Sequence, residues 1–111
     1  MTSYSQLDGG PKLVLAAGIR TPMAKAGGAF AKENVAHLAA ITTRELLAQT
    51  GLPSETINEV ITGCVGQPFD QANVSRVIAL RSGIPQEVPA RTVARNCASG
   101  MEAVTTAAAN I

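Results

Sequence analysis

The sequence predicts an α/β fold in which a mostly parallel sheet carries helices on both faces. Apolar runs rich in β-branched residues alternate with amphipathic segments, in the order strand, helix, strand, helix, strand, helix. This alternation is typical of parallel strands joined by right-handed helical crossovers. Hydrophobic residues make up 46% of the chain but aromatic residues only 3%, so the core is expected to consist of Ala, Val, Ile and Leu.

The first 30 residues predict a tail, a strand and a loop. Residues 1–12 are mostly polar and lack the apolar segment of a secretory signal, so a flexible tail is expected there. Residues 13–17 form a short apolar run that ends at Gly18, which predicts a buried strand. Pro22 and two glycines interrupt residues 19–30 and indicate a loop, without the spacing of a phosphate-binding loop.

A helix is predicted over residues 35–50. Asn34 can cap its first turn, and the apolar residues that follow recur on one face. Gly51 suits the left-handed position after the last turn, and Pro53 prevents continuation. A short turn of helix is expected over residues 54–58.

The next segment predicts strand, helix and strand. Residues 59–65 are rich in Val and Ile and form the second expected strand. Asn73 can start a helix that Gly83 ends. Residues 88–94 contain several β-branched residues and predict a third, buried strand.

Cys97 lies where this third strand gives way to a helix, and the junction is the candidate active site. The first unpaired N–H groups of a helix carry partial positive charge, which favours a thiolate, the nucleophilic form of cysteine. Asn96 is expected to cap the helix, and Gly100 to leave room for a substrate. Four apolar residues at helical spacing are expected to face a core: Met101, Val104, Ala108 and Ile111.

The alternative for Cys97 is a structural role, because free cysteine behaves as a small hydrophobe and is often buried. For Cys64, late in the second strand, the structural interpretation is the stronger one, since no helix terminus activates it. His37 has no second ligand-type residue four positions on. The sequence therefore predicts no metal site.

Charge, length and cysteine content exclude several classes of protein. The net charge of +1 and the absence of Lys/Arg clusters argue against nucleic-acid binding. No apolar segment is long enough to span a membrane. Two cysteines are too few for a disulfide framework, so a reducing compartment and a cytoplasmic location are expected.

Four segments follow one another along the chain: residues 17–30 with Arg20, Thr21 and Pro22, GLPSETINEVITGCVGQ at 51–67, NVSRVIALRSGIPQEVPARTV at 73–93, and NCASGMEAV at 96–104. Together, in this order, they resemble the amino-terminal part of the thiolase family, acyl-CoA C-acyltransferases. The last segment resembles the nucleophile motif of that family and is the most specific of the four.

The resemblance implies acyl transfer between CoA thioesters through an acyl group held on Cys97. The backbone N–H of Cys97 would help to stabilise the oxyanion. In the family, a histidine activates this cysteine and a second cysteine moves the other proton, and both come from the carboxy-terminal half. Neither His37 nor Cys64 matches them. The substrates would be acyl-CoA and CoA, with no further cofactor.

The resemblance also implies an organisation. Residues 13–111 would be a partial amino-terminal domain of the layered thiolase fold, truncated inside the helix after the nucleophile and inactive alone. Charged residues are only 15% of the chain, which fits a surface normally covered by other chain. A homo-oligomer, dimer or tetramer, is expected. Two alternatives stay open: a non-catalytic structural or interaction fragment, and a condensing enzyme of the ketoacyl-synthase type.

Overall fold

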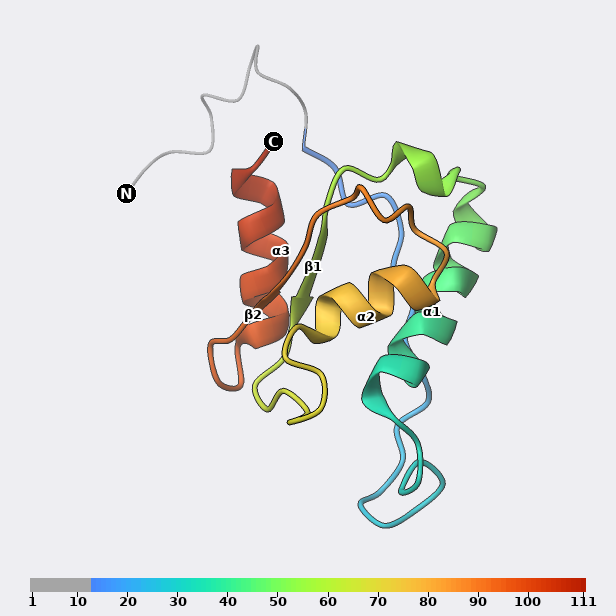
Figure 1. The fold of residues 1–111 in the computed structure, drawn as a ribbon, viewed down its shortest axis with the longest axis vertical. Coiled ribbons are helices and arrows are strands. Elements are labelled where there is room, and N and C mark those ends of the chain that lie inside the picture. The colour runs from blue at the N-terminus through green and yellow to red at the C-terminus, as the bar shows by residue number, and fades with distance from the viewer. Residues whose placement is uncertain (1–12) are drawn as a thin grey trace.

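The computed structural model describes residues 13–111; the predicted tail over 1–12 lies outside them. The described part contains three α-helices, one short 3₁₀ helix and two strands, arranged in layers (Figure 1). In chain order these are α1 (Val35–Thr50), η2 (Ser54–Thr56), β1 (Val60–Gly63), α2 (Val74–Arg81), β2 (Ala90–Val93) and α3 (Ser99–Ala109).

The strands β1 and β2 lie side by side and run parallel. Their register pairs Val60 with Ala90 at one end and Gly63 with Val93 at the other. The ladder continues one bond further, where the backbone N–H of Cys64 donates to the carbonyl of Val93 at 3.0 Å. A parallel pair requires a crossover connection, and α2 supplies it.

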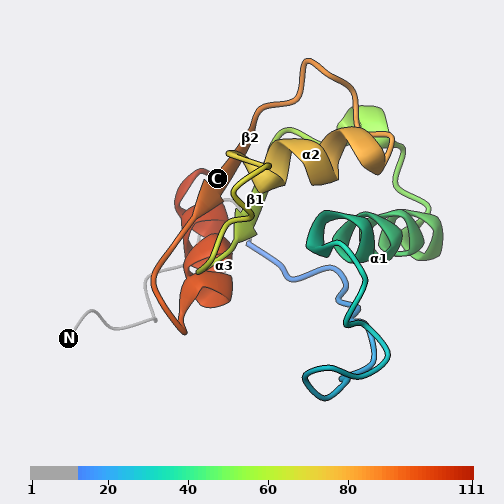
Figure 2. The ribbon, with the colours of Figure 1, turned by 60° about the horizontal axis from the view of Figure 1, so that its bottom comes forward.

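The two faces of this sheet carry different helices. Thr62 points toward α2, because its Oγ1 donates to Ser75 Oγ at 3.0 Å. Gly63, the next residue, faces α3, since a Cβ placed on it would meet the backbone of Ser99. Successive residues of a strand point to opposite faces, so α2 and α3 lie on opposite sides of the sheet. The predicted arrangement of parallel strands with helices on both faces is confirmed (Figures 1 and 2).

α1 forms the outermost layer and packs on α2 (Figure 2). Ala36 of α1 is fully buried against Val74 and Ile78 of α2. A second buried cluster joins Ala79, at the end of α2, to Ile84 and Val88 in the segment leading to β2. The core is therefore built from small aliphatic side chains, as the composition predicts.

The limits of α1 and α2 agree with the predictions. Asn34 caps α1 by accepting from the N–H of Ala36 at 2.9 Å, and Gly51 ends it at φ 66°. Asn73 caps α2 by accepting from the N–H of Arg76 at 3.4 Å. The same Asn73 side chain also holds β2: its Nδ2 donates to the carbonyl of Ala90, and its Oδ1 accepts from Thr92 Oγ1, both at 2.9 Å.

The predicted strand over residues 13–17 is wrong. This segment has no regular structure, and Leu15 within it is 83% exposed. In the part of the chain that the structure describes, β1 and β2 pair only with each other, so residues 13–17 have no ladder to join. The two observed strands are also shorter than the predicted ranges of 59–65 and 88–94, because pairing is confined to four residues of each.

The predicted apolar face of α3 is wrong as well. Met101 is 64% exposed, and Val104 and Ile111 are also exposed. The face next to the strands instead carries the buried Ser99, with Ala103 and Thr106 half-buried one and two turns later. The cause is the contact of the first turn with Gly63, which fixes the rotation of the helix about its axis.

Candidate functional site

Cys97 lies in the turn between β2, which ends at Val93, and α3, which begins at Ser99. The turn follows the carboxyl end of a parallel strand, where open α/β sheets place their ligands (Figure 1). The thiol is free and exposed. The strand-to-helix position inferred from the sequence is therefore the position in the structure, and the catalytic role of Cys97 stays a prediction.

The turn is built from two overlapping backbone hydrogen bonds. The N–H of Ala98 donates to the carbonyl of Arg95 at 2.9 Å, and the N–H of Ser99 donates to that of Asn96 at 3.2 Å. Asn96 adopts φ 45°, in the left-handed region that few residues other than glycine and asparagine enter. The residue directly before the thiol thus has an unusual backbone conformation, which turns the chain sharply.

The expected capping role of Asn96 is wrong. The residue at the N-cap position is Ala98, and no side chain caps the helix. Asn96 contributes its backbone carbonyl instead, which accepts from both the N–H and the hydroxyl of Ser99. Because Asn96 lies outside the first turn in a left-handed conformation, its side chain is not placed to reach the free amides.

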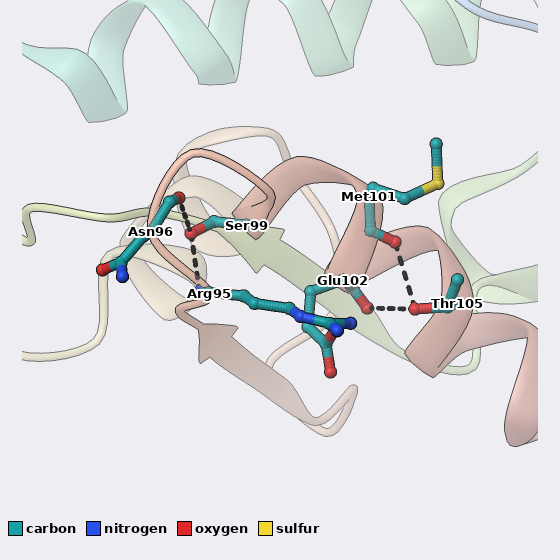
Figure 3. A network of polar contacts seen from close by, with 6 residues as sticks. All are labelled: Arg95, Asn96, Ser99, Met101, Glu102 and Thr105. Carbon is teal, nitrogen blue, oxygen red and sulfur yellow. Dashed lines mark hydrogen bonds and ion pairs between the residues drawn. The ribbon is translucent and has the colours of Figure 1, made fainter.

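Ser99 is a residue that the sequence analysis missed. Its Oγ accepts from the N–H of Arg95 at 2.8 Å and donates to the carbonyl of Asn96 at 2.7 Å (Figure 3). The side chain is buried, with 5% of the residue exposed. A serine at a helix start is a signal for backbone hydrogen bonding, but the sequence does not say that its partners flank Asn96.

Four backbone N–H groups near the thiol have no partner within residues 13–111: those of Asn96, Cys97, Gly100 and Met101. Gly100 and Met101 are the second and third residues of α3, where an α-helix leaves its amides unpaired. Unpaired amides at a helix start carry partial positive charge. This end of α3 can therefore stabilise negative charge on a group bound beside the sulfur.

Charged groups lie along the outer side of the turn. Arg95 Nη1 contacts Glu102 Oε2 at 2.9 Å, with the arginine side chain largely exposed (Figure 3). A second ion pair joins Arg91 to Glu59 at 2.8 Å, near the amino ends of the strands and therefore away from this turn. Exposed pairs such as Arg95–Glu102 contribute little stability.

The other chemically capable residues lie apart from Cys97. His37 is exposed on α1, in the layer beyond α2. Cys64 is half-buried against the cluster formed by Ala36, Val74 and Ile78. Arg20 is exposed and donates to the carbonyl of its neighbour Thr21. Over residues 13–111, no group of three or more His, Cys, Asp or Glu side chains is placed to hold a metal ion.

An apolar groove of about 1020 Å³ lies beside β1. Its walls come from the second half of α1, the segment through η2 and β1, and α3. Leu46, Ile61 and Val104 represent the three walls. Cys97 is not part of its lining, so the groove and the thiol are separate features.

The fold and this turn define an α/β protein with an exposed thiol at a strand-to-helix junction, and comparisons with known proteins identify its family. Residues 13–111 match the thiolase amino-terminal domain. The chain belongs to the thiolase family. Among the described residues, no helix is both long and apolar enough to cross a membrane.

Named relatives and solved structures agree with this assignment. A probable acetyl-CoA acyltransferase of Staphylococcus aureus (strain MRSA252) is 40% identical over 93 residues, covering 84% of this chain and 24% of the relative. A 3-oxoadipyl-CoA/3-oxo-5,6-dehydrosuberyl-CoA thiolase of Escherichia coli (strain K12) is 44% identical over 89 residues, covering 78% of this chain and 22% of the relative.

Two crystal structures match the fold. The acetyl-CoA acetyltransferase of Bacillus anthracis has a TM-score of 0.82 at 36% identity, covering 86% of this chain and 24% of that one. The Acat5 thiolase of Ascaris suum, in complex with coenzyme A, has a TM-score of 0.78 at 30% identity, covering 82% and 24%. The chain spans about a quarter of the length of these relatives. These matches confirm the thiolase-like fold class.

Proposed function

We propose that this chain supplies the acyl-accepting nucleophile of a thiolase, which transfers acyl groups between CoA thioesters. The observation that carries the proposal is the exposed thiol of Cys97, held at the start of α3 beside backbone amides that have no partner among residues 13–111. Membership of the thiolase family and relatives named acetyl-CoA acyltransferase support it.

In the proposed reaction, Cys97 Sγ attacks the carbonyl carbon of a thioester. A C–S bond to the enzyme forms, the C–S bond to CoA breaks, and the CoA thiolate leaves. With a 3-ketoacyl-CoA, attack falls on the keto carbon, and a C–C bond breaks instead, giving the acyl-cysteine and the enolate of acetyl-CoA. The N–H of Cys97 donates to the oxyanion in either case.

Residues 1–111 alone do not complete this cycle. Turnover needs a group that exchanges protons with the substrates, and the imidazole of His37 lies on α1, beyond α2. The resemblance to thiolases assigns the histidine and second cysteine to the carboxy-terminal half. Purified 1–111 is therefore expected to show no thiolytic cleavage of acetoacetyl-CoA, and measurable cleavage would contradict this part of the proposal.

The acylation step itself is tested by incubating the chain with acetyl-CoA and mapping acetyl groups by peptide mass spectrometry. An acetyl thioester, removed by hydroxylamine, is expected on the peptide that contains Cys97. Cys97→Ala should abolish it. The matched control is Cys64→Ala, which removes the half-buried thiol and should leave the adduct intact. Equal modification of both cysteines would contradict a dedicated nucleophile.

Two other functions make different predictions. A non-catalytic fragment would need Cys97 only as a packing residue, with iodoacetamide labelling far slower than that of a free thiol. The exposure of Cys97 argues against it. A condensing enzyme of the ketoacyl-synthase type would be loaded by a malonyl donor rather than by an acetyl or 3-ketoacyl donor. The family match favours the thiolase.

The remaining expectations belong to the same proposal. The substrates are acyl-CoA and CoA, with no additional cofactor, and the protein acts as a homo-oligomer in a reducing, cytoplasmic environment. A relative solved with coenzyme A bound supports the substrate class.

A further inference from the structure

The hydroxyl of Ser99 is buried and uses both of its hydrogen-bonding capacities on the turn that carries Cys97. It accepts from the N–H of Arg95 at 2.8 Å and donates to the carbonyl of Asn96 at 2.7 Å (Figure 3). Only 5% of Ser99 is exposed. A hydroxyl is one donor and an acceptor, so a single side chain bridges the N–H of Arg95 and the carbonyl of Asn96.

Ser99 adds a side-chain hold to a turn that two backbone hydrogen bonds also close. Asn96 adopts φ 45°, a conformation that asparagine tolerates better than most residues but that still costs free energy. The two groups bound by Ser99 are the N–H of the preceding residue, Arg95, and the carbonyl of Asn96 itself. Cys97 follows immediately, so the conformation at Asn96 sets the direction in which the thiol leaves the backbone.

The backbone of Ser99 packs closely against the strand β1. It lies against Gly63 of β1, where a Cβ on the glycine would overlap the Ser99 carbonyl and approach the Gly100 nitrogen to 2.6 Å. The serine thus joins a rigid support, the sheet, to the strained turn. Arg95 and Glu102 add an exposed ion pair across the same turn, which water and salt weaken.

We propose that Ser99 is a positioning residue, whose hydroxyl holds Cys97 beside the free amides of α3 in the orientation needed for acyl transfer. The inference rests on the proposed function in one respect, that Cys97 is the nucleophile. It adds a second residue to the site, one that acts through the backbone and does not touch the acyl group.

The test uses Ser99→Thr and Ser99→Val in the 111-residue chain. Thr and Val have the same shape and differ only in the hydroxyl. Ser99→Ala is the third variant, because it adds no methyl group to a buried site. For each protein we would measure amide hydrogen exchange at Arg95, iodoacetamide labelling of Cys97 and of Cys64, and acetylation of Cys97 by acetyl-CoA.

Ser99→Val and Ser99→Ala are expected to speed exchange at Arg95 about five- to ten-fold through loss of one hydrogen bond. They should slow labelling of Cys97 about two- to five-fold, as the sulfur moves away from the helix terminus. The rate of Cys97 acetylation should fall by at least the same factor as the labelling rate. Ser99→Thr keeps the hydroxyl, so its Arg95 exchange, Cys97 labelling and Cys97 acetylation should match those of the unmodified chain. Cys64 labelling should stay constant, because it reports unfolding of the α1–α2 cluster.

Unchanged Arg95 exchange and unchanged Cys97 labelling in Ser99→Ala would overturn the proposal. So would a parallel rise in Cys64 labelling, which would show that Ser99 acts on global stability. If Ser99→Thr and Ser99→Val both raise Cys64 labelling, the added methyl group has disturbed the fold. Exchange at Arg95 and labelling of Cys97 in Ser99→Ala then test the proposal. If the unmodified chain takes up no acetyl group while the exchange and labelling effects appear, the positioning role stands and the proposed function fails.

Discussion

Asn96, Cys97 and Ser99 divide three tasks within one turn. Asn96 takes the left-handed conformation, and Cys97 presents the thiol to solvent. Ser99 bonds to the N–H of Arg95 and to the carbonyl of Asn96. The sequence places Cys97 correctly, because a strand pattern ending near a helix pattern is a local signal. It does not decide which of Asn96 and Ser99 serves the helix start, since both residue types are favoured there. The choice depends on the contact of Ser99 with Gly63, which is distant in sequence.

Gly100 is the residue whose substitution separates stability from reactivity. A Cβ there would meet no atom of residues 13–111 within 4 Å, and the position lies in the first turn of α3. Gly100→Ala should therefore raise the free energy of unfolding by about 0.5–1 kcal/mol through reduced backbone entropy.

The same variant should slow acetylation of Cys97, because the methyl group occupies space beside the free amides. Urea denaturation and the mass-spectrometric acetylation assay measure the two effects. An acetylation rate that is unchanged in the more stable protein would show that substrate does not approach over Gly100.

At the scale of elements, the helices with local stop and start signals are the predictable ones. The predicted range of α1 coincides with Val35–Thr50, because Asn34 and Gly51 determine its ends without help from distant residues. The same holds for the start of α2 at Asn73. Strand lengths depend on a partner, so β1 and β2 are shorter than their apolar runs, and residues 13–17 form no strand. Which face of α3 is buried also depends on a partner, because the contact with Gly63 of β1 sets it, and the sequence of α3 alone does not predict it.

The docking of α3 on β1 depends on the missing side chain of Gly63. Gly63→Ala would place a Cβ against the backbone of Ser99 and Gly100, where no side chain can move aside. We expect a loss of about 1–3 kcal/mol in the free energy of unfolding, as in other overpacked sites. Displacement of the first turn should also lower Cys97 labelling.

Gly66→Ala is the control for this experiment. Gly66 lies shortly after β1, and a Cβ there would meet nothing within 4 Å in the described part of the chain. Its effect should stay within about 0.5 kcal/mol. Chemical denaturation of the two variants measures the difference, and equal stabilities would show that α3 shifts freely on the sheet.

The whole molecule combines a small aliphatic core with much exposed apolar surface. Buried hydrophobic side chains lie mainly between α1 and α2 and beside β2. Large apolar side chains on α3 and near residue 15 are exposed, and the groove of about 1020 Å³ adds to them. Apolar surface of this kind promotes association. The expected homo-oligomer stays a prediction, with self-association in solution as its test.

Val104→Lys should weaken that association. Val104 is 48% exposed and lines the groove, so a charge there opposes burial without disturbing the core. Met101→Lys is the matched control, on the same helix and 64% exposed but outside the groove lining. Light scattering over a concentration series measures both. A monomeric starting protein at high concentration, or equal effects of the two variants, would contradict the prediction.

The three hydrogen bonds of the Asn73 side chain have a consequence for the placement of Cys97. A slip of one residue in the pairing of β1 and β2 would turn every side chain of β2 to the opposite face of the sheet. Asn73 grips β2 at the Ala90 carbonyl and the Thr92 hydroxyl while it caps α2. After a slip of one residue, neither group would face Asn73, so both hydrogen bonds between Asn73 and β2 would be lost. The contacts of Asn73, at the start of the crossover helix α2, thus favour the one register of β2 that places Cys97 in its observed position.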